Sequence, residues 1–169
     1  MGPSYDVPNM LLTFGEDTPG SYSVVADYVA RGSTPMGSDP SYIESFYGED
    51  VTSAWTKAYS LGTALPPAAE FMGRMLNSPA HVAVTGLTKA DAASLVQEHI
   101  NRFLAWVDAA QPIPARSRGA MNLRDDKLRQ FFYQSQLAKC TAEFGPGMGP
   151  TIAAVTTGPT AEAYVGGGS

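Results

Sequence analysis

The chain has 169 residues, which favours a single domain large enough to bury a core without cross-links. Charged residues make up 16%, well below the usual share, and 17 Gly and 13 Pro indicate much irregular backbone. The net charge of −5 argues against nucleic-acid binding as the main role, and a single cysteine, Cys140, excludes an internal disulfide.

Residues 1–48 are expected to form an extended, mostly irregular arm. Gly, Pro, Ser and Asp interrupt this segment every few positions, as in "GPSYDVPN" and "GEDTPGS". The apolar stretch Tyr22–Ala30 is compatible with either a short helix or a strand. Aromatic residues recur along the segment, and disordered tails are poor in them. We therefore expect the arm to lie on another surface.

From Asp50 onward the pattern becomes helical. Asp50 is a suitable N-cap, and Gly62 is a suitable end for the helix that follows. A second helix is expected to begin at Pro67, which suits a first helical turn, and to end at Asn77. The sequence "HVAVTG", residues 81–86, predicts one short strand.

The best-defined helix is expected from about 89 to 110. Thr88 is a favourable N-cap, and Asp91 stands at the third helical position, as in a capping box with Asp in place of Glu. Apolar residues from Val96 to Val107 recur at spacings of three and four, which is the period of an α-helix.

A last helix is expected from Asn122 to Phe144, with "GPGMGP" ending it and a tail without helical period after it. It contains the consecutive aromatic residues Phe131, Phe132 and Tyr133. Neighbouring helical residues point about 100° apart, so three rings sweep more than one buried face. We therefore predict that at least one of these rings contacts another chain.

The charge is distributed unevenly along the chain. Residues 1–50 carry eight acids and one base, which gives −7, whereas residues 111–143 carry six bases and three acids, which gives +3. These segments can pair within one monomer or between neighbouring copies, and the basic segment can also contact phosphate. The candidate residues for such contacts are Arg116, Arg118, Arg124, Lys127 and Arg129.

No motif identifies a reaction. His81 and His99 are the only imidazoles, and neither a His pair nor a Cys pair is present at metal-ligand spacing. The glycines of "GPGMGP" follow a helix, whereas phosphate-binding glycine loops open one. We expect no catalytic residue, no metal site and no cofactor.

Together these features predict a mainly α fold with a small helical core of about four helices, one short extended segment and long irregular N- and C-terminal arms. The expected division is an arm over 1–48, a helical core over 49–144 and a Gly/Pro/Thr-rich tail over 145–169. Trp55 and Tyr164 are further candidates for contacts between subunits, because the surplus of aromatic surface exceeds what a monomer usually exposes.

The expected function is that of a structural subunit of a large homopolymeric assembly, of the viral or phage coat or capsid type. The alternatives are a non-catalytic accessory subunit of an enzyme complex, and a coat protein that contacts nucleic acid through residues 116–129. The expected partners are other copies of the chain and other virion or complex proteins, with nucleic acid secondary. No signal peptide and no membrane-spanning run are visible, so we expect a virion or a cytoplasmic assembly.

Overall fold

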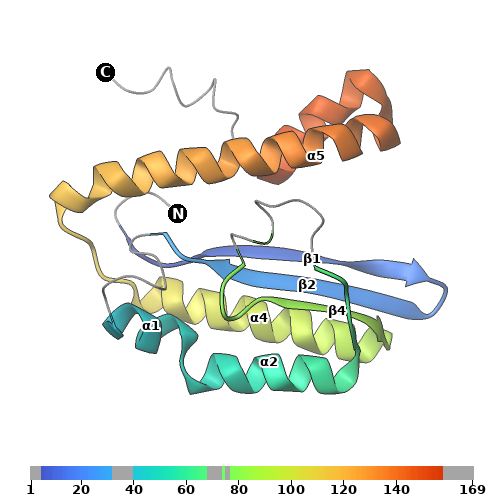
Figure 1. Ribbon diagram of the computed structural model, residues 1–169, viewed down its shortest axis with the longest axis horizontal. Helices are drawn as coiled ribbons and strands as arrows, with labels where there is room; N and C mark the ends of the chain where they lie inside the picture. Colours follow the sequence, from blue (N-terminus) through green and yellow to red (C-terminus); the bar gives the residue numbers. More distant parts are fainter. Residues whose placement is uncertain (1–4, 32–39, 68–73, 75–76, 158–169) are drawn as a thin grey trace. The chain divides into compact units, whose positions relative to one another are not determined.

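The structure, a computed structural model, describes residues 5–31, 40–67, 74 and 77–157. The chain divides into two compact units, Met1–Ile113 and Pro114–Ser169, which are described separately. The fold is mixed α/β, with a four-stranded antiparallel sheet in the first unit (Figure 1). The prediction of a mainly α fold is therefore wrong.

The largest departure from that prediction is a long β-hairpin within the segment expected to be irregular. β1 (Asn9–Thr18) pairs antiparallel with β2 (Ser21–Val29), from Asn9 opposite Val29 to Thr18 opposite Ser21. Pro19 and Gly20 form the turn, and Gly20 has a φ of 81°. A type II turn requires a positive φ at this position, and Pro is common before it.

The sheet is completed by two later strands, in the order β1-β2-β4-β3. β4 (Val82–Leu87) pairs with β2, and the two-residue β3 (Thr63–Ala64) pairs with β4. The strand expected at residues 81–86 is thus confirmed. A shift in the β2–β4 register accompanies Gly86, whose φ is 77°, and places Leu87 among the core residues next to Val84.

Helices of the first unit pack on the sheet, mainly on β2 and β4. They are α1 (Pro40–Tyr47), α2 (Glu49–Leu61) and α4 (Lys89–Ala109). The expected helices after Asp50 and Thr88 are confirmed. The expectation of Asp50 as N-cap is wrong, because α2 begins at Glu49 with Gly48 as its N-cap. α1 lies in the segment expected to be irregular. The helix expected over 67–77 falls largely on residues 68–73 and 75–76, outside the described residues.

The core lies between these helices and one face of the sheet. Every second residue of β2 faces the helices, which gives strand β2 its alternating apolar pattern. Two buried clusters result, one towards the start of β2 and one towards its end. The first includes Val24, Ala26, Val84 and Leu95, and the second includes Tyr28, Tyr42, Tyr47 and Val51.

The second unit is built on α5 (Ala115–Thr157), two helical segments that meet at Gly145. Gly145 has φ 78° and ψ 168°, so the helix end expected at "GPGMGP" is confirmed, although a helix follows where a non-helical tail was predicted. A Cβ on Gly149 would lie 2.5 Å from Thr141 Cα, so the two segments pack closely against each other. The division of the chain at residues 48 and 144 stays a prediction.

Candidate functional site

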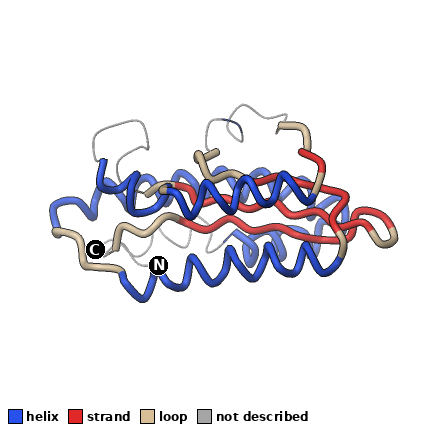
Figure 2. The backbone as a smooth tube through the Cα atoms, turned by 90° about the horizontal axis from the view of Figure 1, so that it is seen from below, coloured by secondary structure: helices blue, strands red, loops and turns tan. Residues whose placement is uncertain are grey.

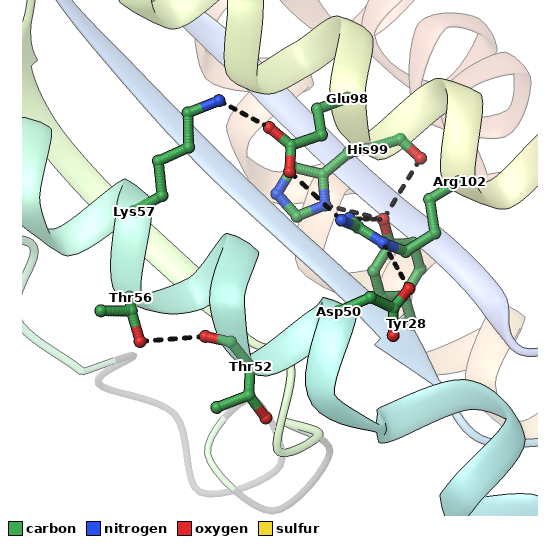
Figure 3. Close-up of polar contacts among 8 residues, drawn as sticks. All are labelled: Tyr28, Asp50, Thr52, Thr56, Lys57, Glu98, His99 and Arg102. Carbon is green, nitrogen blue, oxygen red and sulfur yellow. Dashed lines mark hydrogen bonds and ion pairs between the residues drawn. The ribbon is translucent and has the colours of Figure 1, made fainter.

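The most developed arrangement of polar side chains lies where β2, α2 and α4 meet (Figure 3). We call it the polar cluster. Its side chains come from one residue of β2, two of α2 and three within two turns of α4. Its members are Tyr28, Asp50, Lys57, Glu98, His99 and Arg102.

The Tyr28 hydroxyl is the centre of the polar cluster. It donates a hydrogen bond to the His99 main-chain carbonyl over 3.2 Å and lies 2.8 Å from His99 Nδ1. Arg102 Nη1 donates to the Tyr28 oxygen at 3.4 Å. The buried Nε2 of His99 has no hydrogen-bond partner among the described residues.

Ion pairs surround this buried centre and join α2 to α4. Glu98 accepts from Lys57 Nζ at 2.9 Å and from Arg102 Nη2 at 3.2 Å. Arg102 Nε also lies 3.5 Å from a carboxylate oxygen of Asp50. Lys57 and Asp50 are well exposed, so each outer pair contributes only about 0–1 kcal/mol. The arrangement orients Arg102, whose side chain is 11% exposed, towards Tyr28.

Burial and neighbouring charges shift the pKa values of this cluster. Burial, together with the positive charge of Arg102, lowers the pKa of His99 from 6.5 to about 4. Burial raises the pKa of Tyr28. The hydrogen bond from Lys57 lowers the pKa of Glu98. At neutral pH the centre therefore combines a neutral imidazole and a neutral phenol with a paired guanidinium.

The two central side chains of the polar cluster, Tyr28 and His99, are buried inside the core. Tyr28 is 0% exposed and His99 is 3% exposed. A general acid or base must come within hydrogen-bond reach of a bound substrate, and neither side chain lines the pocket described below. The cluster can therefore fix the position of α4 on the sheet and make its packing sensitive to the protonation of His99.

A second buried polar contact holds the turn that leads into β4. Asp27 is 1% exposed and accepts hydrogen bonds from the backbone N–H groups of Tyr28 and Ser78, at 2.7 and 3.1 Å. It also accepts a hydrogen bond from the Ser78 hydroxyl, whose oxygen in turn accepts from the Ala80 N–H. This carboxylate is satisfied locally, which indicates a structural role.

The described residues also line a pocket of about 300 Å³ at the C-terminal end of α4. An isolated β-bridge between Tyr5 and Pro112 brings the start of the chain to this helix end. The pocket walls come from residues 6 and 7, from α1, and from the last turn of α4 with the two residues that follow it. Asp6, Phe46, Trp106 and Gln111 are among the lining residues.

The three consecutive aromatic residues of α5 are all half-buried. The rings of Phe131 and Phe132 lie 5.5 Å apart at 63°, in an edge-to-face contact. The two Phe rings therefore contact each other across neighbouring helix faces. Tyr133 is half-buried as well. Their role between subunits stays a prediction.

Trp55 lies in the first unit, on α2, and is 41% exposed. Its ring packs on Tyr59 with the centroids 4.7 Å apart, and the Tyr59 hydroxyl accepts a hydrogen bond from the Ala83 N–H. Part of Trp55 is thus held by the monomer and part is available to a partner. Tyr164 lies outside the described residues.

The candidate basic residues all belong to α5, and none of them lies in the polar cluster. Lys127 is exposed and its Nζ contacts Gln130 Oε1 at 3.5 Å. Arg118, Arg124 and Arg129 are half-buried and each has an interaction partner. The side chain of Arg116 lies outside the described residues. Contact of this segment with phosphate or an acidic partner stays a prediction.

Two further properties concern only the described part of the chain. Within it, no group of three His, Cys, Asp or Glu side chains is placed to hold a metal ion. Among the helices it contains, none combines the length and the apolar character that crossing a bilayer requires.

The sequence interpretation missed the polar cluster for a specific reason. It considered His99 only for a metal pair in the sequence, and its acidic neighbour in the chain, Glu98, does not face it, because adjacent helical residues point in different directions. The structure agrees, because Glu98 accepts from Arg102, four residues along α4, whereas His99 contacts the Tyr28 hydroxyl. The decisive partner, Tyr28, is 71 residues away, and only the placement of β2 beside α4 could reveal it.

Comparisons with protein-family models and with curated proteins found no match to this chain.

Proposed function

We propose that this chain is a structural subunit of a large protein assembly, of the kind that forms a viral or phage coat. The observation that carries the proposal is the free end of the β1–β2 hairpin. All six residues Thr13–Thr18 of β1 are exposed, and Phe14 among them is 61% exposed. Figures 1 and 2 show from two directions that this end extends beyond the helices of the first unit.

β1 is also an edge strand with little protection. It is the outermost strand of the sheet, and no other described strand pairs with its outer side. Proteins that remain monomeric usually protect such an edge with Lys, Pro, a short strand or a bulge. β1 contains ten residues without Lys or Pro, and its one register irregularity lies at its end, between Glu16 and Thr18. The opposite edge, β3, is only two residues long.

The sequence of β1 suits pairing with β1 of a second copy. In an antiparallel pair centred on Thr13, Glu16 stands opposite Met10 of the second copy. The acidic ends of the two strands then lie about 20 Å apart at about 3.4 Å per residue, so their charges repel only weakly. The unpaired backbone groups of both edges would be satisfied in one continuous sheet.

Such a two-fold contact closes on itself, so a large assembly needs a second contact. The second unit offers exposed apolar side chains for it. Leu123 is 63% exposed, Phe144 is 45% exposed and Met148 is 61% exposed. Neighbouring copies that meet through both surfaces would form an extended array.

Light scattering after size-exclusion chromatography tests the proposal. We expect the wild-type chain to assemble, and Thr13→Lys to reduce assembly at least tenfold because a lysine on an edge strand opposes pairing. Ser60→Lys adds the same charge at an exposed position on α2 and serves as the control. A wild-type chain that stays monomeric at high concentration would refute the proposal, as would a Thr13→Lys variant that assembles like Ser60→Lys.

A further inference from the structure

Hydrogen bonds on the far side of the sheet show which backbone groups of β1 are used within the hairpin. The Ala83 carbonyl of β4 accepts from the Leu65 N–H at 2.8 Å, and the Ala83 N–H donates to the Tyr59 hydroxyl at 3.2 Å. Both groups of Ala83 therefore point away from β2. Its partner Val25 must direct its own backbone groups towards β1, where Thr13 stands opposite it. Thr13 thus forms its backbone hydrogen bonds inside the hairpin.

The residues on either side of Thr13 therefore serve the free edge of β1. Because the direction of the backbone groups alternates along a strand, Leu12 and Phe14 direct theirs outward. Phe14 stands opposite Val24, which belongs to the buried cluster under the helices, so the side chains of Leu12 and Phe14 lie on the helix-covered face. Leu12 packs against this cluster, whereas Phe14 is 61% exposed. The helices of its own copy thus leave the Phe14 ring largely open.

The sequence around Phe14 distinguishes the registers in which two β1 edges can pair antiparallel. A pair centred on Leu12 places Glu16 opposite Pro8, which has no N–H to donate. A pair centred on Phe14 leaves the two Glu16 residues about 14 Å apart along the strands, against about 20 Å in a pair centred on Thr13. The Thr13 register therefore separates the acids better, and it places Phe14 of each copy opposite Leu12 of the other.

On the basis of the assembly proposed above, we propose that Phe14 sets the register of the contact between copies by packing on Leu12 of the second copy. Residues directly opposite each other in an antiparallel pair have Cβ atoms about 5 Å apart, close enough for the ring to cover the leucine side chain. The ring then also covers the flank of the second copy's buried cluster, against which Leu12 packs. The two-fold axis makes this contact occur twice, so pairing covers the exposed ring of both copies.

Disulfide trapping tests the register. Thr13→Cys in a Cys140→Ser background places two thiols opposite each other across the two-fold axis, in a pair without hydrogen bonds between copies. The Cα atoms of such a pair lie about 4.5 Å apart, which a disulfide can span. Gly15→Cys in the same background is the control, since nothing lies within 4 Å of its Cβ and its counterpart is about 14 Å away along the strands. With oxidised glutathione we expect a covalent dimer of the Thr13→Cys chain on a non-reducing gel and none of the Gly15→Cys chain.

Variants of Phe14 connect the register to its ring. Phe14→Ser should weaken self-association by about tenfold or more and reduce the trapping of Thr13→Cys, whereas Phe14→Leu should retain most of both. Leu61→Ser removes an apolar side chain that is 38% exposed on α2 and should change neither.

The outcomes separate this inference from the assembly itself. A wild-type chain that assembles while Thr13→Cys is not trapped would overturn the register and leave the assembly standing, whereas a monomeric wild-type chain would overturn both. Equal trapping of Thr13→Cys with and without Phe14→Ser would overturn the role of the ring.

Discussion

Acid should destabilise the first unit through His99 specifically. In the folded chain this imidazole is buried and neutral, with its pKa lowered from 6.5 to about 4. In the unfolded chain it is free to take up a proton near its ordinary pKa. Between these two values the unfolded state binds more protons than the folded state, so stability falls as the pH falls. The contribution is fully present above pH 6.5 and is lost on approaching pH 4.

The size of the effect follows from the pKa difference. Each unit of pKa difference corresponds to 1.36 kcal/mol, so the limiting loss is about 3 kcal/mol. Between pH 7 and pH 4.5 about 2 kcal/mol of this should appear. That is a large fraction of the stability of an ordinary domain, which is about 5–15 kcal/mol. The charge of Arg102, directed at the same hydroxyl as His99, works against protonation of the folded state.

Urea unfolding at several pH values, compared between wild type and His99→Asn, isolates this contribution. Asn keeps a polar side chain at this position but does not titrate, so the stability of the His99→Asn variant should depend on pH less steeply than that of the wild type. His81→Asn, on the half-buried residue before β4, is the control for removing an imidazole elsewhere. Parallel pH profiles for wild type and His99→Asn would show that the buried imidazole has an ordinary pKa, and the interpretation of the polar cluster would fail.

Two further predictions concern packing and capping. Gly149→Ala should destabilise the second unit by about 1–3 kcal/mol, because its Cβ would meet the Thr141 backbone at 2.5 Å. Gly147→Ala, where a Cβ meets nothing within 4 Å, should be neutral or stabilising. Urea unfolding followed by circular dichroism compares the two variants, and equal losses in the free energy of unfolding would contradict the close packing. Thr88→Ala should lower the free energy of unfolding by about 1 kcal/mol through loss of the N-cap, whereas Thr88→Ser should retain most of it; a similar loss in both would mean that the cap contributes little.

The sequence predicted those elements whose signals are local. The start of α4 depends on Thr88 and Asp91, which lie within one turn, and the Asp91 N–H donates to Thr88 Oγ1 at 3.1 Å as the pattern indicates. The end of the first segment of α5 depends on Gly145 alone, whose positive φ a residue with a Cβ rarely adopts. Such features need no knowledge of distant partners.

The hairpin was missed because its signals were interpreted one at a time. Pro19 and Gly20 indicate a turn, and the even-numbered residues from Tyr22 to Tyr28 alternate with the others as a strand requires. Helix and strand remained open for this stretch, since short apolar runs do not distinguish them. The deciding interactions come from Val82 and Val84 of β4, which no local pattern places beside β2.

The order of the strands has a consequence for synthesis on the ribosome. β1 and β2 are joined by a two-residue turn and can pair in about 1–10 μs once both have emerged. The residues that cover them, up to Ala109 at the end of α4, follow roughly 80 residues later, which takes about 4–16 s at ordinary translation rates. During those seconds the hairpin presents an uncovered apolar face and an open edge. Val24 and Ala26 remain exposed until β4 and α4 have been synthesised and can pack on them. The nascent chain is therefore most exposed to wrong strand pairing between the completion of β2 and the completion of α4, and protection by a chaperone would matter most in that interval.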